Sequence, residues 1–226
     1  MNCLWCDTDI IPEISWKTII QPPERKKLCP SCEDQLQILQ GKRCSTCSRE
    51  SEEEMCSDCR RWKLSRHDAP LEWNYSVFTY NDRMQEMISR WKYRGDYSLG
   101  NAFENYYRKA FSRIVSFLPK DTAAVPIPLS EERIKERGFN QSGMLAGFLP
   151  LETVELLVRT HSEKQSKRTR RERITAENPF RTEQTFNKPV ILADDIYTTG
   201  TTLHHAAFIL KRNGCPAVYA LTLIRG

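Results

Sequence analysis

The 226-residue sequence predicts an α/β protein, in which a parallel sheet is flanked by helices and follows a small cysteine-rich module. Two observations favour this class. Between residues 74 and 226, short apolar runs typical of buried strands alternate with longer stretches of helical periodicity. Eight of the nine cysteines, by contrast, lie within the first 59 residues. We therefore expect the cysteine-rich module at residues 1–62, a linker at 63–73 and the α/β domain at 74–226.

Composition limits the classes of function. With 39% apolar residues, 28% charged residues and a net charge of +5, the chain resembles soluble globular proteins and permits an anionic partner. No apolar stretch is long enough to cross a bilayer, and the first residues lack a basic leader followed by an apolar core. We therefore expect a cytoplasmic protein with no transmembrane segment.

The clustered cysteines form four Cys-x-x-Cys pairs, a spacing typical of metal sites. Such a turn presents two thiolates on one side, and two turns complete a tetrahedral zinc site, so we expect two structural zinc ions. A disulfide framework fits a leaderless chain poorly. The spacing leaves the pairing open: joining consecutive pairs would make a double zinc ribbon, but crossed pairing also gives two tetrahedra. The expected ligands are Cys3, Cys6, Cys29, Cys32, Cys44, Cys47, Cys56 and Cys59.

A zinc module of this size has two possible roles. Its folding energy should come largely from metal, at about 10 kcal/mol or more per ion, so chelation should unfold it. Its tryptophans, Trp5, Trp16 and Trp62, and the basic residues near them could stack bases and contact phosphates. They could equally pack a small fold that only caps the α/β domain.

The α/β domain begins after a stretch without clear periodicity at residues 60–70. Residues 74–80 alternate and predict a strand, and Asp82 is expected to cap the helix that follows. Residues 97–117 predict a second helix. The apolar side chains at helical spacing in the first helix are expected to belong to the core; they are Met84, Met87, Ile88 and Trp91.

Residues 123–128 predict a short apolar strand, followed by a helical stretch at 131–149 that Gly138 interrupts. A glycine inside a helix costs about 1 kcal/mol, so the break indicates a functional reason for the segment around it. Residues 153–158 are expected to form the next parallel strand. Residues 159–173 hold seven Lys or Arg against two Glu and no apolar face, which predicts a mobile loop that could close over a pyrophosphate or contact single-stranded DNA.

The segment at residues 190–202 has the most specific chemistry. An apolar strand at 190–193 ends in two carboxylates, Asp194 and Asp195, where open α/β sheets hold their ligands. A glycine among four threonine hydroxyls then leads into a helix, whose N-terminal N–H groups and dipole suit a phosphate. The carboxylates suit the paired hydroxyls of a ribose or a divalent metal. The phosphate-binding residues are expected to be Thr198, Thr199, Gly200, Thr201 and Thr202.

This segment resembles the loop that binds phosphoribosyl pyrophosphate (PRPP) in type I phosphoribosyltransferases. The pattern of that loop is an apolar run, two acidic residues, two further residues and Thr-Thr-Gly-x-Thr. Over nearly the whole chain, the order of motifs resembles the ComF family of competence proteins, in its ComFC-like members. The motifs are the cysteine pairs, Lys-Tyr-Arg-Gly-Asp, Val-Pro-Ile-Pro-Leu, Glu-Arg-Gly-Phe-Asn-Gln, Asn-Pro-Phe and Asp-Asp-Ile-Tyr-Thr-Thr-Gly-Thr-Thr.

The resemblance implies a type I phosphoribosyltransferase-like sheet with an N-terminal double zinc ribbon, and a role in the uptake of transforming DNA. It implies that PRPP binds with its ribose on Asp194 and Asp195, which would also be the catalytic residues, and its phosphate on the threonine loop. Single-stranded DNA and competence proteins such as a DNA-translocating helicase are the implied partners. Pyrophosphate, with magnesium, would lie near Pro126, Ile127, Pro128 and Arg137, under Arg168, Arg171 and Arg173.

Two functions remain open at this point. One is a DNA-uptake factor that binds PRPP or ribose phosphate. The other is an active phosphoribosyltransferase that acts on a nucleobase or a nucleotide-like acceptor.

Overall fold

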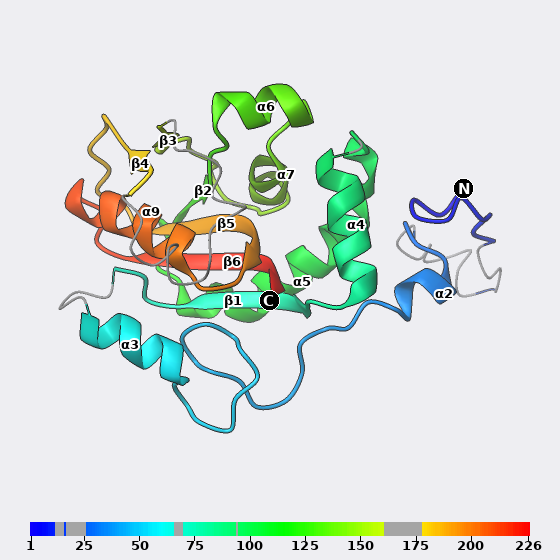
Figure 1. The fold of residues 1–226 in the computed structure, drawn as a ribbon, viewed down its shortest axis with the longest axis horizontal. Coiled ribbons are helices and arrows are strands. Elements are labelled where there is room, and N and C mark those ends of the chain that lie inside the picture. The colour runs from blue at the N-terminus through cyan, green and yellow to red at the C-terminus, as the bar shows by residue number, and fades with distance from the viewer. Residues whose placement is uncertain (12–15, 17–25, 66–69, 94, 161–177) are drawn as a thin grey trace.

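A four-stranded parallel sheet forms the centre of the molecule in the computed structural model (Figure 1). The structure describes residues 1–11, 16, 26–65, 70–93, 95–160 and 178–226. The strand order is β1-β6-β5-β2, and every neighbouring pair is parallel, which confirms the predicted class. The strands are β1 (Asn74–Thr79), β2 (Ala123–Pro126), β5 (Val190–Tyr197) and β6 (Val218–Arg225).

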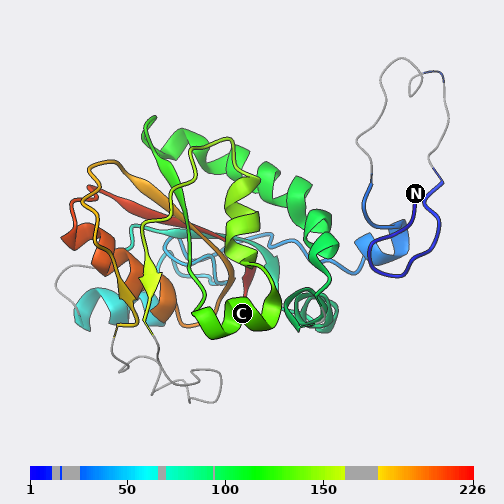
Figure 2. The ribbon, with the colours of Figure 1, turned by 90° about the horizontal axis from the view of Figure 1, so that it is seen from above.

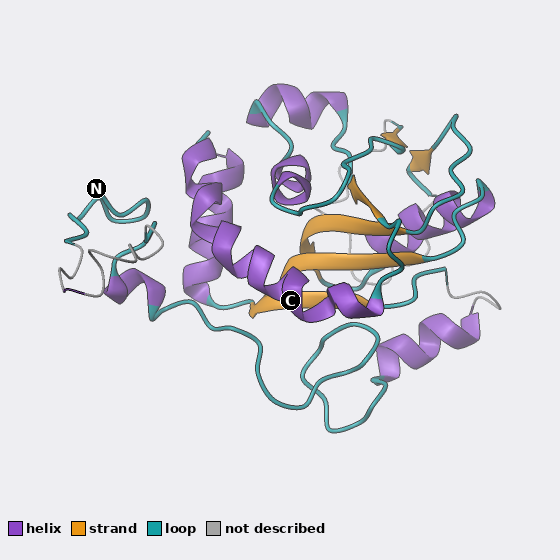
Figure 3. Cartoon of the chain, turned by 180° about the vertical axis from the view of Figure 1, so that it is seen from behind, coloured by secondary structure: helices purple, strands orange, loops and turns teal. Residues whose placement is uncertain are grey.

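Helices cover both faces of this sheet (Figure 3). Along β5, Ile191 and Ala193 face one side, whereas Val190 and Leu192 face the other, so the strand is apolar on both sides. On the first face lie α4 (Asp82–Tyr93), η1 (Tyr97–Phe103), α5 (Glu104–Ile114), η2 (Val115–Phe117) and α7 (Gln141–Gly147). On the second face lies α9 (Thr201–Arg212).

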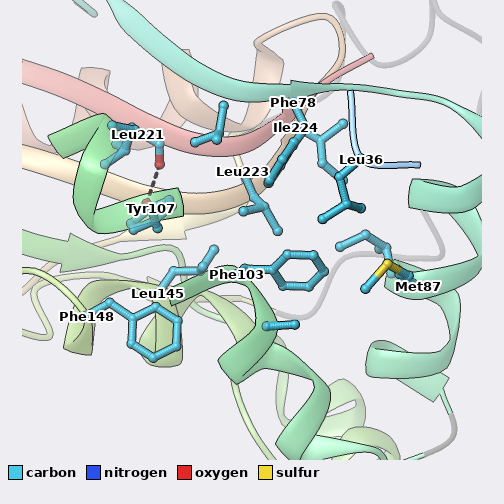
Figure 4. Close-up of a cluster of buried hydrophobic side chains, with 14 of the residues drawn as sticks. Leu36, Phe78, Met87, Phe103, Tyr107, Leu145, Phe148, Leu221, Leu223 and Ile224 are labelled. Carbon is cyan, nitrogen blue, oxygen red and sulfur yellow. Dashed lines mark hydrogen bonds between the residues drawn. The ribbon is translucent and has the colours of Figure 1, made fainter. Parts of the chain in front are cut away.

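The core of the first face is rich in large side chains (Figure 4). Phe78 of β1 meets Phe103 edge to face, with ring centroids 6.3 Å apart. The Tyr107 hydroxyl donates a 2.6 Å hydrogen bond to the Leu221 carbonyl, so the polar group buried in this core is satisfied. The predicted core residues Met84, Met87, Ile88 and Trp91 of α4 are all buried here.

The start of α4 corrects one prediction. Asn81, rather than Asp82, caps this helix, since its side-chain oxygen accepts a 2.8 Å hydrogen bond from the Met84 N–H. Asp82 is the first helical residue, where its negative charge suits the helix dipole. The predicted helix at 97–117 is divided, because the 3₁₀ turns of η1 and η2 flank α5.

The predicted break at Gly138 is confirmed. It ends α6 (Glu131–Arg137) with a φ of 77°, a left-handed conformation that glycine adopts without strain, and α7 begins three residues later. The parallel strand predicted at 153–158 is wrong. Thr153 makes a single parallel bridge to Ala124, after which β3 (Val158–Arg159) pairs antiparallel with β4 (Phe180–Arg181). The side chains of this apolar run pack in a loop instead.

The two cysteine-rich segments lie at different places on the domain. The first, residues 1–11 and 26–36 with α2 (Pro30–Glu33), stands to one side beyond α4 (Figure 2). The second, residues 42–65, ends in α3 (Ser57–Ser65) and packs on the same face as α9. Part of the stretch predicted to be a linker is therefore helical and belongs to the second segment, with Trp62 buried.

The connections of the sheet create a crevice between β2 and β5. The chain leaves β2 through α7 on one face toward the bridge at Thr153, and it leaves β5 in the opposite direction, through α9 on the other face, toward β6. Open α/β sheets bind ligands at such a switch point, outside the carboxyl ends of the strands. Among the described residues, no helix is long and apolar enough to cross a bilayer.

Candidate functional site

A cavity of about 280 Å³ lies at the carboxyl ends of β2 and β5. The motifs predicted from the sequence meet there, because Asp194, Asp195 and all five residues of the threonine loop (198–202) line it. Arg137 and Ile127 line it too. Pro126, the last residue of β2, and Pro128 do not. Arg168, Arg171 and Arg173 lie outside the described residues.

The threonine loop ends at the first turn of α9. Gly200 precedes this helix with a φ of 78°, and no side chain caps the helix at that position. A Cβ on Gly200 would lie 2.2 Å from the Tyr197 hydroxyl oxygen, so the loop requires glycine for its conformation and for space. The Thr199 and Thr201 hydroxyls are 2.9 Å apart. Backbone N–H groups, hydroxyls and the helix dipole therefore meet at this loop, a combination that suits an anion.

The two carboxylates differ in their surroundings. Asp195 forms an ion pair with Lys92, at the end of α4, and both side chains are largely buried. Asp194 accepts a 3.0 Å hydrogen bond from the Ser142 hydroxyl. Burial and, secondarily, the nearby charge of Asp195 raise the pKa of Asp194 to about 7, while Lys92 and Ser142 oppose the rise. The pair therefore places a carboxyl group that can exchange a proton near neutral pH, Asp194, beside a carboxylate that is paired with a lysine.

The opposite wall of the cavity is cationic, with Arg133, Arg137 and Arg159. Arg137 is 8% exposed and donates a 2.9 Å hydrogen bond to the Gln141 side-chain oxygen. Among the described residues, Nε of Arg137 and Nε2 of Gln141 have no hydrogen-bond partner although both atoms are buried. Burial lowers the pKa of Arg159, and Arg133 and Arg137 lower it further. An anion placed here would neutralise the crowded cations and accept hydrogen bonds from the unpartnered buried donors.

The family-like motifs around the cavity have structural explanations. Asn140 caps α7 by accepting from the Ser142 N–H at 3.0 Å, and its amide donates to the Ile127 carbonyl at 3.1 Å, which ties α7 to the loop after β2. Asn178 donates to the His205 carbonyl at 2.8 Å and so fastens the segment before β4 to α9. These bonds hold two segments that flank the cavity, the loop after β2 and the segment before β4, against their neighbouring helices.

Sequence reasoning missed several residues of the site. Lys92 appeared only as part of the Lys-Tyr-Arg-Gly-Asp motif, Ser142 received no role, and Arg159 was considered only as the first residue of the basic segment at 159–173. The position of Lys92 in the basic Lys-Tyr-Arg-Gly-Asp turn was the available signal. Two further residues touch the threonine loop from outside the cavity. Trp62 donates to the Thr199 carbonyl at 3.0 Å, and Arg225 donates to the carbonyls of Tyr197 and Thr198, each at 3.0 Å.

The cysteines form two groups of four, and each group joins consecutive Cys-x-x-Cys pairs. Within a group, all four sulfurs lie within 4.8 Å of one another. Cys6 and Cys29 are 3.6 Å apart, and Cys47 and Cys56 3.7 Å. A tetrahedron with zinc–sulfur bonds of about 2.3 Å has edges of about 3.8 Å, so both groups fit zinc. The first cluster is Cys3, Cys6, Cys29 and Cys32, and the second cluster is Cys44, Cys47, Cys56 and Cys59.

No family model matches the chain. It is 40% identical to competence protein ComFC of Bacillus subtilis, over 99% of this chain and 94% of that protein. It is 28% identical to competence protein ComFC of Streptococcus pneumoniae, over the full length of both. DNA utilization protein YhgH of Escherichia coli is 26% identical, over 88% of this chain and 96% of that protein.

Among solved structures, a hypoxanthine phosphoribosyltransferase from Staphylococcus aureus is similar with a TM-score of 0.35 and 13% identity. The match covers 56% of this chain and 64% of that one. A likeness at that TM-score carries no argument about function.

Proposed function

The chain belongs to the family of ComFC competence proteins, and from that premise we propose that it binds PRPP in the cavity at the carboxyl ends of β2 and β5. One observation carries the proposal. A single cavity has two walls suited to anions, the threonine loop and the arginine wall of Arg133, Arg137 and Arg159, with two carboxylates between them. PRPP has the matching order of a phosphate, a polyol and a pyrophosphate.

The 5-phosphate would lie on the threonine loop. The loop contains no lysine or arginine, so backbone N–H groups, hydroxyls and the dipole of a twelve-residue helix would bind the dianion. Asp195, which is fixed by Lys92, would accept hydrogen bonds from the ribose hydroxyls. The anomeric carbon would then point toward the arginine wall.

The pyrophosphate would lie on that wall, where Arg137 and Gln141 each have a buried donor that lacks a partner among the described residues. Magnesium, which the sequence resemblance implies, would be held mainly by oxygens of the ligand, because Asp195 already pairs with Lys92. It would supply charge neutralisation for the pyrophosphate. Arg168, Arg171 and Arg173 would join this wall under the same proposal.

Calorimetric titration of the full chain tests the proposal. PRPP should bind more tightly than ribose 5-phosphate, and ribose should bind at least about 100-fold more weakly than either, because it lacks both anions. The double variant Asp194→Asn with Asp195→Asn should weaken PRPP binding at least about tenfold. Asp121→Asn, which changes an exposed carboxylate outside the cavity, is the control. Equal affinity for ribose and PRPP would contradict the proposal.

A second candidate function is transfer of the phosphoribosyl group, and the raised pKa of Asp194 favours it. In such a reaction the bond from the anomeric carbon to pyrophosphate breaks, the acceptor bonds to that carbon, and Asp194 takes the acceptor's proton. The arginine wall would stabilise the departing pyrophosphate. Pyrophosphate release from PRPP, measured with a panel of nucleobases and nucleotides, separates transfer from binding alone. A rate equal to spontaneous hydrolysis with every acceptor would leave binding as the function.

We extend the proposal to two structural zinc ions, one in each cluster, and to single-stranded DNA and competence proteins such as a DNA-translocating helicase as partners. The DNA contact predicted at residues 159–173 lies almost entirely outside the described residues. Neutralising Lys167, Arg168, Arg170 and Arg171 should weaken DNA binding and reduce its dependence on salt concentration. An unchanged salt dependence would move the contact to another surface.

A further inference from the structure

We propose that Trp62 and Arg225 position the threonine loop from the second cluster, so that metal bound by this cluster and phosphate bound by the loop stabilise each other. The inference rests on the proposed binding of a phosphorylated ligand by the loop. It adds a role for one of the two metal sites, and it predicts that the other site lacks that role.

Trp62 makes the first connection. It follows Cys59 by three residues on α3, and residues three apart lie next to each other on one side of a helix. The indole therefore lies beside a sulfur of the second cluster. The indole N–H donates a 3.0 Å hydrogen bond to the Thr199 carbonyl, in the middle of the loop. Its ring stacks on His204, in the first turn of α9, at a centroid distance of 4.2 Å and an angle of 16°. One buried side chain thus holds both the loop and the start of the helix that follows it.

Arg225 makes the second connection. It is the last residue of β6 and is 7% exposed. One guanidinium nitrogen donates to the carbonyls of Tyr197 and Thr198, each at 3.0 Å, while the other donates to the sulfur of Cys47 at 3.7 Å. The guanidinium also lies 4.8 Å from the centre of the Tyr197 ring. Arg225 therefore spans from Cys47, in the second cluster, to Thr198, the first residue of the loop, and Tyr197 just before it.

The charge of the second cluster explains why these contacts should depend on bound metal. A buried guanidinium is costly without a negative partner. Four thiolates around one divalent ion carry a net negative charge, so a loaded second cluster is a suitable partner for Arg225. Loss of the ion would let the sulfurs take up protons, which removes that charge, and would release Cys47 and Cys59 from their fixed positions. Both anchors of the loop would then be less well placed.

The first cluster provides an internal control. Its neighbour Trp5 lies under the guanidinium groups of Arg83 and Arg90, and Arg90 donates a 2.8 Å hydrogen bond to the Trp5 carbonyl. In the described part of the chain, no hydrogen bond or ion pair joins this cluster to the threonine loop. Figure 1 shows α4 between the first cysteine-rich segment and the rest of the domain.

A matched pair of tryptophan variants tests the first connection. Trp62→Phe keeps a ring that can stack on His204 but removes the N–H, and we expect affinity for ribose 5-phosphate to fall about three- to tenfold by calorimetry, the range of one hydrogen bond. Trp5→Phe should leave that affinity unchanged. Both variants should retain two zinc ions per chain. Equal affinities for wild type and Trp62→Phe would overturn this role for Trp62.

Zinc release tests the coupling from the metal side, because a ligand that stabilises the loop and its two anchors should also slow the opening of the second cluster. With excess chelator and a colorimetric zinc indicator, saturating ribose 5-phosphate should slow the release of one zinc ion at least about threefold and leave the other unchanged. Arg225→Gln should speed release of that same ion without ligand, and Cys6→Ser should not. If both ions were released at the same rates with and without ribose 5-phosphate, the coupling would be overturned.

The outcomes separate this inference from the proposed function. If the wild-type chain binds no ribose 5-phosphate or PRPP, the proposed function fails and the inference fails with it. If the wild-type chain binds the ligand, but neither zinc release nor Trp62→Phe responds as stated, the coupling alone fails.

Discussion

The two four-cysteine clusters use the same ligands and the same spacing within each pair, yet they have different neighbours. The first cluster stands beyond α4 and contacts it through Trp5. The second cluster lies against α9 and the threonine loop, through Trp62 and Arg225. The same four-cysteine arrangement therefore stands beyond α4 in one place and supports the loop beside the cavity in another. The effect of metal loss on the rest of the protein therefore depends more on the residues that surround a cluster than on its ligands.

Replacing one ligand in each cluster should expose this difference most strongly. Cys59→Ser should remove one zinc ion, lower the stability of the α/β domain by several kcal/mol and abolish binding of ribose 5-phosphate, since a structural zinc contributes about 10 kcal/mol to the fold around it. Cys6→Ser should also remove one zinc ion but leave ligand binding within about twofold of wild type. Zinc content, urea denaturation and calorimetry measure the three effects. Equal loss of ligand binding in both variants would erase the proposed difference between the clusters.

Glycine substitutions should sharpen the comparison at the loop itself. Gly200 and Gly138 have nearly equal φ values, 78° and 77°. Only at Gly200 would a Cβ collide, 2.2 Å from the Tyr197 hydroxyl oxygen, and the Tyr197 ring lies beneath Arg225. Gly138→Ala should cost about 1 kcal/mol for the left-handed conformation alone. Gly200→Ala should cost about 2–4 kcal/mol.

Denaturant midpoints measure both costs. Zinc retention in Gly200→Ala gives a second reading, because displacement of Tyr197 should disturb Arg225 and the sulfur of Cys47. If the two alanine variants were equally stable, the loop would be less tightly held by the second cluster than its contacts indicate.

The features that could be predicted from the sequence are those that depend on residues close together in the chain. The Cys-x-x-Cys pairs, the paired aspartates and the threonine loop each occupy a short segment, so spacing alone indicated that the members of each set lie close together. The contacts that give these groups a context join distant residues. Trp62 and Thr199 are 137 positions apart, and Arg225 and Cys47 are 178 apart, beyond the range of any periodicity.

The wrong predictions have related causes. Residues 153–158 carry apolar residues of the kind found in a strand, but the sheet offers Thr153 only one bridge, and Leu156 and Leu157 are buried in a loop. Residues 63–65 were assigned to a linker because residues 60–70 lack an apolar stripe, but they continue α3. This helix is stabilised by the contact of Trp62 with His204 and by the neighbouring cluster.

Asp194 should respond to pH independently of either cluster. Its pKa is about 4 in an unfolded chain and about 7 in the folded protein without ligand. Between these values the folded state holds a proton that the unfolded state has released, so this group's contribution to stability falls as pH rises from 4 to 7. Asp194→Asn should therefore match wild type at pH 4 and be about 1–3 kcal/mol more stable at pH 8.

Urea denaturation at pH 4 and pH 8 measures this effect, and Asp121→Asn is the control. A stability gain that required zinc in the second cluster would show that the carboxylate pair and the cluster are coupled. A variant less stable than wild type at pH 8 would show that the Asp194 pKa is not raised.

The smallest expected effect concerns α4, which joins the first cluster to the cavity. Arg83 and Arg90 of this helix lie against Trp5, and Lys92, one residue from its end, pairs with Asp195. Lys92 is nevertheless fixed by its buried partner, and Met84, Met87, Ile88 and Trp91 hold the helix in the core independently of Trp5. Arg83→Gln with Arg90→Gln should thus change ribose 5-phosphate affinity less than about twofold, the scale of exposed charge contacts. A larger loss by calorimetry, with zinc content unchanged, would mean that α4 transmits the state of the first cluster to Asp195. Both clusters would then affect ligand binding, the first through α4 and the second through Trp62 and Arg225.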